Sequence, residues 1–228
     1  MPLPDLVIFD CDGVLVDSEP ISMSVLVEVV GRAGASISRD TAYRRFLGRS
    51  MATTAEILRD EFGLAITDAH LEDIRARLYD RFRRELRPTP GIAAVVDRIP
   101  ARKCVASSSK PERIRLSLQV TGLLERFEPH IYSSTMVENG KPSPDLFLYA
   151  ADAMGVEPGN CAVVEDSPAG IEAAHRAGMR VYAYVGATHA EPGDLRASAE
   201  AMSPDAIFED MKDLPHLLAA AGAVAKDG

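Results

Sequence analysis

Two aspartates near the start of the chain have the residue type and spacing of a metal-assisted nucleophilic site. Asp10 and Asp12 follow the apolar run 6–9 and stand directly before Gly13. In an extended strand alternate side chains share a face, so the two carboxylates project to the same side. Crowding two negative charges costs free energy unless a cation or a reacting phosphate balances them. Two acids at a strand end are as often turn formers or solvated caps, so the pair alone does not decide.

A run of serines supplies a second candidate group. Ser107, Ser108 and Ser109 follow the apolar residues 104–106 and precede a predicted helix. Hydroxyls and free backbone N–H groups at the start of a helix suit the oxygens of a phosphate. Ser109 also stands three residues before Glu112, the spacing of a capping box. Plain helix capping by Ser109 is therefore the alternative interpretation.

A lysine and a pair of acids complete the candidate set. Lys141 stands in a proline-stiffened Gly-Lys-Pro loop, where its point charge can neutralise a phosphoryl group. Glu165 and Asp166 directly follow the apolar run 161–164. Two or three carboxylate oxygens grouped together suit Mg²⁺ as ligands. Each residue also has a plainer explanation. A surface lysine is normally solvated, and an acid such as Asp166 is favoured at the start of a helix.

The elements that must position these residues alternate between strands and helices. Strands are expected at 6–10, 103–106, 130–132, 161–164, 181–185 and 206–208, and helices at 111–121, 143–154, 168–177 and 211–221. Such alternation predicts a doubly wound α/β core, with a parallel sheet covered on both faces. Ligands gather at the carboxyl edge of a sheet of this kind. The aspartates, serines, lysine and acid pair are all expected to converge at that edge.

The stretch after the first strand has a different pattern. Helical patterns follow one another there without a convincing strand, at 20–33, 39–47, 51–62 and 68–86. The flanks, Asp17-Ser18 and 87–91, have the composition of hinges. The expected domains are an α/β core, 1–15 and 88–228, and an inserted α-helical bundle cap, 16–87.

Composition excludes several classes of protein. The 228 residues carry a formal net charge of −9, which argues against nucleic acid as a partner, and 46% of them are hydrophobic, enough for a real core. No apolar run reaches the roughly 18 residues that span a bilayer, and no signal-peptide pattern opens the chain. The three cysteines lack disulfide or metal spacing, as expected of buried thiols in a reducing compartment. We expect a cytoplasmic protein, free of membranes, that is a monomer or a weak homo-oligomer.

In combination these motifs resemble those of the haloacid dehalogenase (HAD) superfamily. The matching residues are Asp10-Cys11-Asp12-Gly13-Val14, Ser107, Lys141 within Gly-Lys-Pro, and Glu165-Asp166-Ser167. Residues 12–20, followed by a helical insert, resemble the phosphatase and β-phosphoglucomutase-like branch, and the similarity covers nearly the whole chain. Residues 9–13 and Asn160-Cys161 are also similar to 6-phosphogluconate phosphatase-like proteins, which is a lead toward sugar-acid phosphates.

The resemblance implies a Rossmann-like core fold, an α-helical (C1-type) cap and a role for each motif residue. Asp10 is expected to be the nucleophile that forms an aspartyl-phosphate, and Asp12 the residue that protonates the leaving alcohol and then activates water. The implied ligands of Mg²⁺ are Asp10, the backbone carbonyl of Asp12 and Asp166, with Glu165 as a supporting acid. The implied phosphate-binding residues are Ser107, Ser108 and Lys141.

The helical insert narrows the reaction that the resemblance implies. It contains no lysine, which a phosphonoacetaldehyde hydrolase would need for a Schiff base. A mutase of the β-phosphoglucomutase type uses a cap histidine soon after the first motif, where Ser22 stands here. A dehalogenase uses one leading aspartate without the metal motif, so Asp12 and Asp166 argue against it. The expected function is an Mg²⁺-dependent phosphatase acting on small phosphomonoesters, sugar phosphates or sugar-acid phosphates.

Two alternatives stay open, and one loop is expected to recognise the substrate. The alternatives are a phosphosugar mutase and a non-catalytic protein of this fold that binds phosphorylated metabolites. A product that is an isomer of the substrate, rather than free phosphate, would indicate the mutase. Tight binding of the metabolite without turnover would indicate the non-catalytic protein. Arg49, with Ser50 beside it, lies in a loop between predicted insert helices. Its guanidinium is expected to contact a carboxylate, hydroxyl or phosphate of the phosphorylated metabolite.

Overall fold

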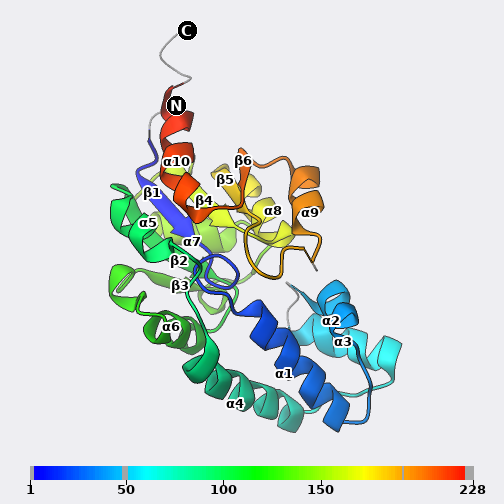
Figure 1. The fold of residues 1–228 in the computed structure, drawn as a ribbon. Coiled ribbons are helices and arrows are strands. Elements are labelled where there is room, and N and C mark those ends of the chain that lie inside the picture. The colour runs from blue at the N-terminus through cyan, green and yellow to red at the C-terminus, as the bar shows by residue number, and fades with distance from the viewer. Residues whose placement is uncertain (1–2, 48–50, 192, 224–228) are drawn as a thin grey trace.

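The computed structural model describes residues 3–47, 51–191 and 193–223, and these form a parallel sheet with helices on both faces and beyond one edge (Figure 1). The strands in this part of the chain are β1 (Leu6–Phe9), β2 (Arg102–Ser107), β3 (Ile131–Ser133), β4 (Cys161–Glu165), β5 (Arg180–Tyr184) and β6 (Ala206–Phe208). Their order in the sheet is β3-β2-β1-β4-β5-β6. The doubly wound α/β core predicted from the sequence is confirmed.

The strand order places a switch point beside β1. The chain runs outward from β1 through β2 to β3, returns to β4 on the other side of β1, and continues outward to β6. Phe9 pairs with Val105 of β2 and with Val164 of β4, so these three strands end at one level. In open parallel sheets ligands bind outside the carboxyl ends of the strands at such a point. The candidate residues that follow β1, β2 and β4 therefore lie at the same edge.

Two helical layers cover the sheet. Alternate residues of a strand face opposite sides, so Val7 and Phe9 enter one apolar cluster and Leu6 and Ile8 the other. The first cluster includes residues of α5 (Ile92–Arg98), α6 (Pro111–Val120) and α10 (Leu214–Ala223), and the second includes residues of α7 (Asp145–Ala153), α8 (Pro168–Arg176) and α9 (Leu195–Met202). Short 3-10 helices lie at Leu124–Arg126, Ser134–Met136, Pro158–Asn160 and Met211–Asp213. Because both faces of the sheet are buried, the strands appear in the sequence as continuous apolar runs.

The helices between β1 and α5 gather beyond the carboxyl edge of the sheet. They are α1 (Glu19–Arg32), α2 (Arg39–Phe46), α3 (Met51–Phe62) and α4 (Asp68–Glu85), called the cap helices below. Figure 1 shows them at the end of the molecule away from both chain termini. α1 packs against α2 and α4, and α4 also packs against α6 of the core. The helical patterns predicted for this stretch are confirmed almost to the residue.

The chain enters and leaves the cap helices at adjacent points. The N–H of Asp17 donates to the carbonyl of Arg87 at 3.1 Å, and the N–H of Thr89 donates to the carbonyl of Leu15 at 3.0 Å. Two neighbouring crossings of this kind suit a hinge, because small backbone rotations there would move the cap helices as a group. The division into a core domain and a cap domain stays a prediction.

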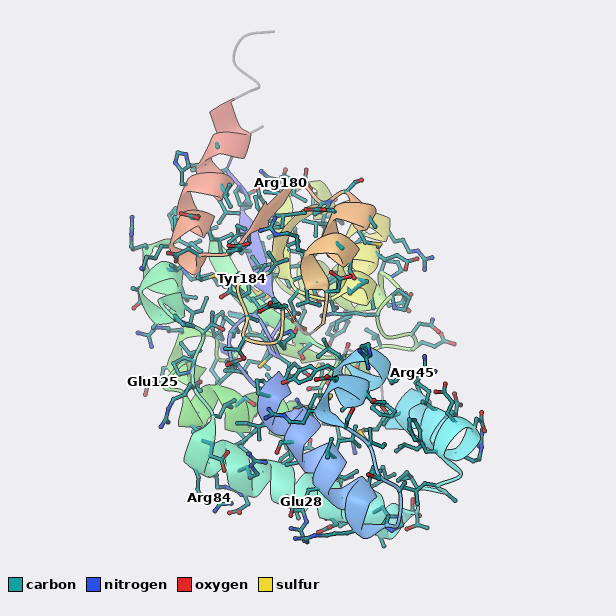
Figure 2. The ribbon with its side chains drawn as sticks, turned by 45° about the vertical axis from the view of Figure 1, so that its right-hand side comes forward. Glu28, Arg45, Arg84, Glu125, Arg180 and Tyr184 are labelled. Carbon is teal, nitrogen blue, oxygen red and sulfur yellow. The ribbon has the colours of Figure 1, made fainter. Side chains whose placement is uncertain are left out.

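The outer surface of the cap helices is charged. Figure 2 shows Glu28, Arg45 and Arg84 on the outside of this group. Arg45 pairs with Glu61, and Arg84 pairs with Asp80 across one helical turn. Exposed ion pairs of this kind contribute about 0–1 kcal/mol each to the stability of the fold. These arginines are therefore solvated surface residues rather than part of a reactive site. Among the described residues, none of the helices combines the length and the apolar character needed to cross a bilayer.

Two helices and one helix cap differ from the expectations. The sequence patterns do not predict α5 and α9, which have 7 and 8 residues. The predicted capping by Ser109 is wrong, since Lys110 is the N-cap of α6. The Ser109 hydroxyl donates instead to the carboxylate of Asp12, at 2.6 Å. A hydrogen bond to an ionised group is stronger than one to a backbone N–H, which explains the choice.

Candidate active site

A glycine shapes the turn that follows β1. The N–H groups of Leu15 and Val16 donate to the carbonyl of Cys11, and the N–H of Gly13 donates to the carbonyl of Val16 at 2.8 Å. Gly13 has a φ of +85°, and a Cβ at this position would lie 2.0 Å from Oδ2 of Asp166. Glycine is therefore required both for the backbone conformation and for the space. Because Gly13 has no side chain, the turn after β1 can pack directly against the residue that follows β4.

A buried lysine joins acids that follow different strands. Nζ of Lys141 lies 2.6 Å from Oδ1 of Asp10 and 2.5 Å from Oε1 of Glu165, and it donates to the carbonyl of Ala106 at 3.1 Å. The ammonium also lies 4.9 Å from the centre of the Phe147 ring. The side chain is only 4% exposed. The explanation of Lys141 as an ordinary solvated lysine is therefore wrong.

Glu165 is held from two directions. Its Oε1 faces Lys141, while Oε2 accepts hydrogen bonds from the N–H groups of Asp166 and Ser167 and from the Ser167 hydroxyl, each at 3.0 Å. The side chain is 1% exposed. A carboxylate engaged in this way fixes the position of Lys141 and the turn between β4 and α8.

Asp166 has a partner that the motifs do not contain. Nε2 of His189 donates to Oδ2 of Asp166 at 3.0 Å, and the side chain of His189 is 1% exposed. His189 belongs to the loop between β5 and α9, a segment in which the sequence analysis singled out no residue.

Asp12 accepts three hydrogen bonds from side chains. The Ser18 hydroxyl donates to Oδ1 and the Ser109 hydroxyl to Oδ2, both at 2.6 Å, and Nη2 of Arg113 donates to Oδ1 at 2.9 Å. Arg113 comes from α6, and its guanidinium stacks 5.3 Å from the ring centre of Phe82 in α4. One guanidinium thus connects a core helix, a cap helix and the second aspartate of the first motif.

The pKa values of Asp10 and Lys141 reflect a competition between burial and the charges of their neighbours. Burial raises the pKa of Asp10 well above its ordinary value, and Glu165 and Asp166 add to the rise, while Lys141 acts against it. Burial by itself would lower the pKa of Lys141, but Asp10 and Glu165 raise it above its ordinary value. The lysine is therefore firmly charged. A second cation close to Asp10 would favour the ionised carboxylate further.

The two other aspartates are affected in opposite directions. Burial alone would raise the pKa of Asp12, but Arg113 and the two serine hydrogen bonds hold it below its ordinary value. Burial raises the pKa of Asp166, although His189 opposes the rise. Burial and the charge of Asp12 also raise the pKa of Glu19, at the start of α1, to about 7. Asp12 is therefore ionised in the arrangement described.

The serines after β2 are placed differently from one another. Ser107 is buried, and its hydroxyl accepts a hydrogen bond from the N–H of Ser109 at 3.2 Å. Lys141 contacts the carbonyl of Ala106, the residue directly before Ser107. Ser108 is exposed, and its carbonyl accepts a hydrogen bond from the hydroxyl of Ser134 at 2.9 Å.

The donor set at this edge fits a small hard cation. Asp10 and Asp166 are 7% and 8% exposed, and the charge of Asp166 raises the pKa of Asp10, so a divalent cation between them would relieve repulsion. Across the described ranges, no three His, Cys, Asp or Glu side chains form a group able to hold a metal by themselves. Mg²⁺ does not require such a group, because it binds through one or two carboxylates and keeps waters and phosphate oxygens.

The structure brings the core motif residues together and adds two that the sequence did not single out. Asp10 and Asp166 follow neighbouring strands at one edge of the sheet, and Lys141 contacts Asp10, as predicted. The additions are Arg113 and His189. Arg113 follows Ser109 by four residues, a spacing that could have placed both at the same end of the predicted helix, whereas no local pattern marks His189. The predicted substrate residues Arg49 and Ser50 lie outside the described residues, so their role stays a prediction.

Replacing Gly170 by alanine is expected to destabilise the protein through Glu165. Gly170 lies in the first turn of α8, and a Cβ there would lie 1.9 Å from Cδ of Glu165 and 2.0 Å from its Oε1. The buried carboxylate cannot move without losing Lys141 or the turn N–H groups. We expect the free energy of unfolding to fall by about 1–3 kcal/mol, measured by urea denaturation.

The matched control for this substitution is Gly31→Ala. Gly31 lies in α1 with nothing within 4 Å of an added Cβ. Alanine there should raise the stability by about 0.5–1 kcal/mol, because it reduces the freedom of the unfolded chain. Equal stability of the Gly170→Ala variant and the unsubstituted protein would contradict the tight placement of Glu165.

Comparisons with known proteins identify the family of this chain. The model of the haloacid dehalogenase-like hydrolases matches residues 4–178. The 6-phosphogluconate phosphatase of Escherichia coli is 31% identical over 82% of this chain and 86% of the relative. The phosphorylated carbohydrates phosphatase of Thermotoga maritima is 30% identical over 92% of this chain and 99% of the relative.

A solved structure extends the agreement to the whole fold. A conserved haloacid dehalogenase-like protein of unknown function from Agrobacterium tumefaciens superposes with a TM-score of 0.83 and 34% identity, over 95% of this chain and 98% of that one. Motifs, fold and relatives thus coincide over nearly the full length. The chain belongs to the haloacid dehalogenase-like hydrolases and is a phosphoric monoester hydrolase.

Proposed function

We propose that this protein is an Mg²⁺-dependent phosphatase that hydrolyses small phosphorylated sugars or sugar acids through an aspartyl-phosphate on Asp10. The contact of 2.6 Å between Nζ of Lys141 and Oδ1 of Asp10 carries the proposal. A buried cation thus lies beside Asp10, whose carboxylate would attack the phosphoryl group. Phosphoryl transfer depends on placement and charge neutralisation above all, and this pair supplies both.

The residues of the site divide the reaction into two steps. In the first, an oxygen of Asp10 attacks phosphorus, the bond from phosphorus to the leaving oxygen breaks, and Asp12 gives its proton to the leaving alkoxide. In the second, Asp12 takes a proton from water as that water attacks the aspartyl-phosphate. The bond from phosphorus to Asp10 then breaks, inorganic phosphate leaves and both carboxyl groups return to their starting states. Ser107 and Lys141 hold the phosphoryl oxygens in both steps.

The residues present would hold Mg²⁺ through Asp10, the backbone carbonyl of Asp12 and Asp166. When bound, the cation supplies charge neutralisation between the anionic nucleophile and the anionic ester. Glu165 would act indirectly, because its carboxylate holds Lys141 and the turn N–H groups. Ser108 keeps a predicted role in phosphate binding through its position in the turn.

Asp12 must first take up a proton from solvent water to act as the acid of the first step, and for this it must lose its present hydrogen-bond partners. In the arrangement described it is ionised and hydrogen-bonded to Ser18, Ser109 and Arg113. Ser18 stands at the entrance to the cap helices, and Arg113 stacks on Phe82 of α4. Movement of the cap helices about the crossings near Leu15 would therefore alter these contacts. We infer that cap opening admits substrate and that closure excludes water and frees Asp12 for proton transfer.

The substrate class rests on the relatives. One acts on 6-phosphogluconate and another on phosphorylated carbohydrates, as their names state. An uncharged sugar or a sugar acid as leaving group would lie next to Asp12 and Arg113, where a guanidinium and hydroxyl groups are available. A cytoplasmic location is also part of the proposal, supported by the three buried cysteines, which are free thiols.

Removal of Mg²⁺ is expected to abolish phosphate release. The purified protein should release inorganic phosphate from p-nitrophenyl phosphate and from members of a panel of sugar and sugar-acid phosphates, and EDTA should stop the reaction. Restored Mg²⁺ should return the rate. Conversion of β-glucose 1-phosphate into an isomer, without free phosphate, would indicate a mutase instead. Binding of the panel without turnover in the presence of Mg²⁺ would indicate a non-catalytic protein and contradict the proposal.

A further inference from the structure

A histidine outside the four motifs covers the end of β4. The ring of His189 is buried, with Nε2 3.0 Å from Oδ2 of Asp166. Its Cε1 would lie 2.9 Å from a Cβ at Gly13. The ring therefore closes over the place where the first turn meets Asp166. Of the five histidines in the sequence it is the one that is buried.

The loop that carries His189 is fixed on the far side of the site as well. The hydroxyl of Thr188 donates to both carboxylate oxygens of Asp17, at 2.8 Å each. The carbonyl of His189 accepts a hydrogen bond from the N–H of Gly193 at 2.9 Å. These contacts hold the backbone of the loop independently of the imidazole. The ring is thus not needed to close the loop.

Only one of the two ring nitrogens of His189 has a hydrogen-bond partner in the part of the chain that the structure describes. Nδ1 of His189 is buried and has no hydrogen-bond partner within the described residues. A buried polar atom without a partner costs about 1–3 kcal/mol. An apolar side chain of similar size would fill the space without that cost. The polar contact from Nε2 to Asp166 is therefore the property of the ring that a purely space-filling role does not explain.

We propose that His189 is a positioning residue that fixes the Asp166 carboxylate for a divalent cation. The inference rests on the proposed function, because it assigns Asp166 as a ligand of Mg²⁺. By binding Oδ2, the imidazole sets the plane of the carboxylate. His189 engages Oδ2, which leaves Oδ1 as the oxygen through which Asp166 would bind the cation. Outer partners of this kind typically change metal affinity or activity by about 10- to 100-fold when they are replaced.

The test compares Mg²⁺ binding among variants in the absence of substrate. His189→Leu fills the space but cannot donate, and is expected to weaken Mg²⁺ binding by about 10- to 100-fold in isothermal titration calorimetry. Its melting temperature in EDTA should lie close to that of the unsubstituted protein, because removal of the unpartnered Nδ1 offsets loss of the hydrogen bond to Asp166. His175→Leu, on the exposed side of α8, is the matched control and should bind Mg²⁺ normally.

A second pair of variants keeps the test decisive if leucine disturbs folding. The amide of glutamine can reach the position of Nε2, whereas that of the shorter asparagine cannot. His189→Gln should therefore bind Mg²⁺ more tightly than His189→Asn. Equal affinity of these two variants, or normal affinity of His189→Leu, would overturn the positioning role.

The same measurements separate this inference from the proposed function. If the unsubstituted protein neither binds Mg²⁺ nor releases phosphate, the proposed function is wrong and the inference falls with it. If the unsubstituted protein does both and the His189→Leu variant binds Mg²⁺ equally well, the inference alone is wrong. If the His189→Leu variant has a lower melting temperature in EDTA but an unchanged affinity for Mg²⁺, the ring has only a structural role.

Discussion

Replacing Asp10 by asparagine is expected to lower kcat for phosphate release on the order of 10³-fold or more, without loss of stability. The amide cannot form the aspartyl-phosphate, so the whole first step is lost rather than slowed. Stability should be equal or higher, because burial and the nearby charges of Glu165 and Asp166 already raise the pKa of Asp10 and so oppose its ionisation. The measurements are phosphate release with Mg²⁺ and thermal unfolding in EDTA.

The control for Asp10→Asn lies just before the other end of β1. Asp5 precedes β1 at the opposite edge of the sheet and is exposed, so Asp5→Asn should keep full activity. Acid quenching during turnover should leave phosphate on the unsubstituted protein and none on Asp10→Asn. Wild-type turnover by the Asp10→Asn variant would show that the nucleophile has been assigned to the wrong residue.

Replacing Lys141 by methionine should reduce both activity and stability. The variant leaves Asp10 and Glu165 buried without the ammonium that lies within 2.6 Å of each, and removing one partner of a buried pair typically costs about 3–5 kcal/mol. Loss of the cation at the phosphoryl group should also lower kcat by about 10²–10³-fold. Urea denaturation near neutral pH measures the first effect and phosphate release the second. Lys212→Met, at an exposed position, should change neither.

A double variant shows whether the stability loss comes from unpaired charge. In Lys141→Met with Asp10→Asn, one of the two uncompensated carboxylates is gone, so part of the lost stability should return. Groups in direct contact typically show interaction energies of about 0.5–3 kcal/mol in such a cycle. Strict additivity of the two single changes would mean that Lys141 and Asp10 do not interact in solution, against the 2.6 Å contact.

The sequence alone determined the core of the site because its information is local. Each motif residue follows an apolar run, and the carboxyl ends of parallel strands meet at one edge, so Asp10, Ser107 and Asp166 could be placed together without coordinates. The cap helices could be predicted for the same reason, since a period of 3.6 residues repeats within each helix. The short helices α5 and α9 were not predicted.

Only the tertiary structure decided which side chains complete the site. Arg113 meets Asp12 across 101 positions of the chain, and His189 meets Asp166 across 23. Contacts of this kind depend on how helices and loops pack after the strands have assembled, and neighbouring residues do not encode them. The Ser109 hydroxyl illustrates the same point, because the local pattern assigned it to a helix cap and the nearby carboxylate of Asp12 attracted it instead. Local sequence specified the charges at the edge of the sheet, and long-range packing selected the partners that hold them in place.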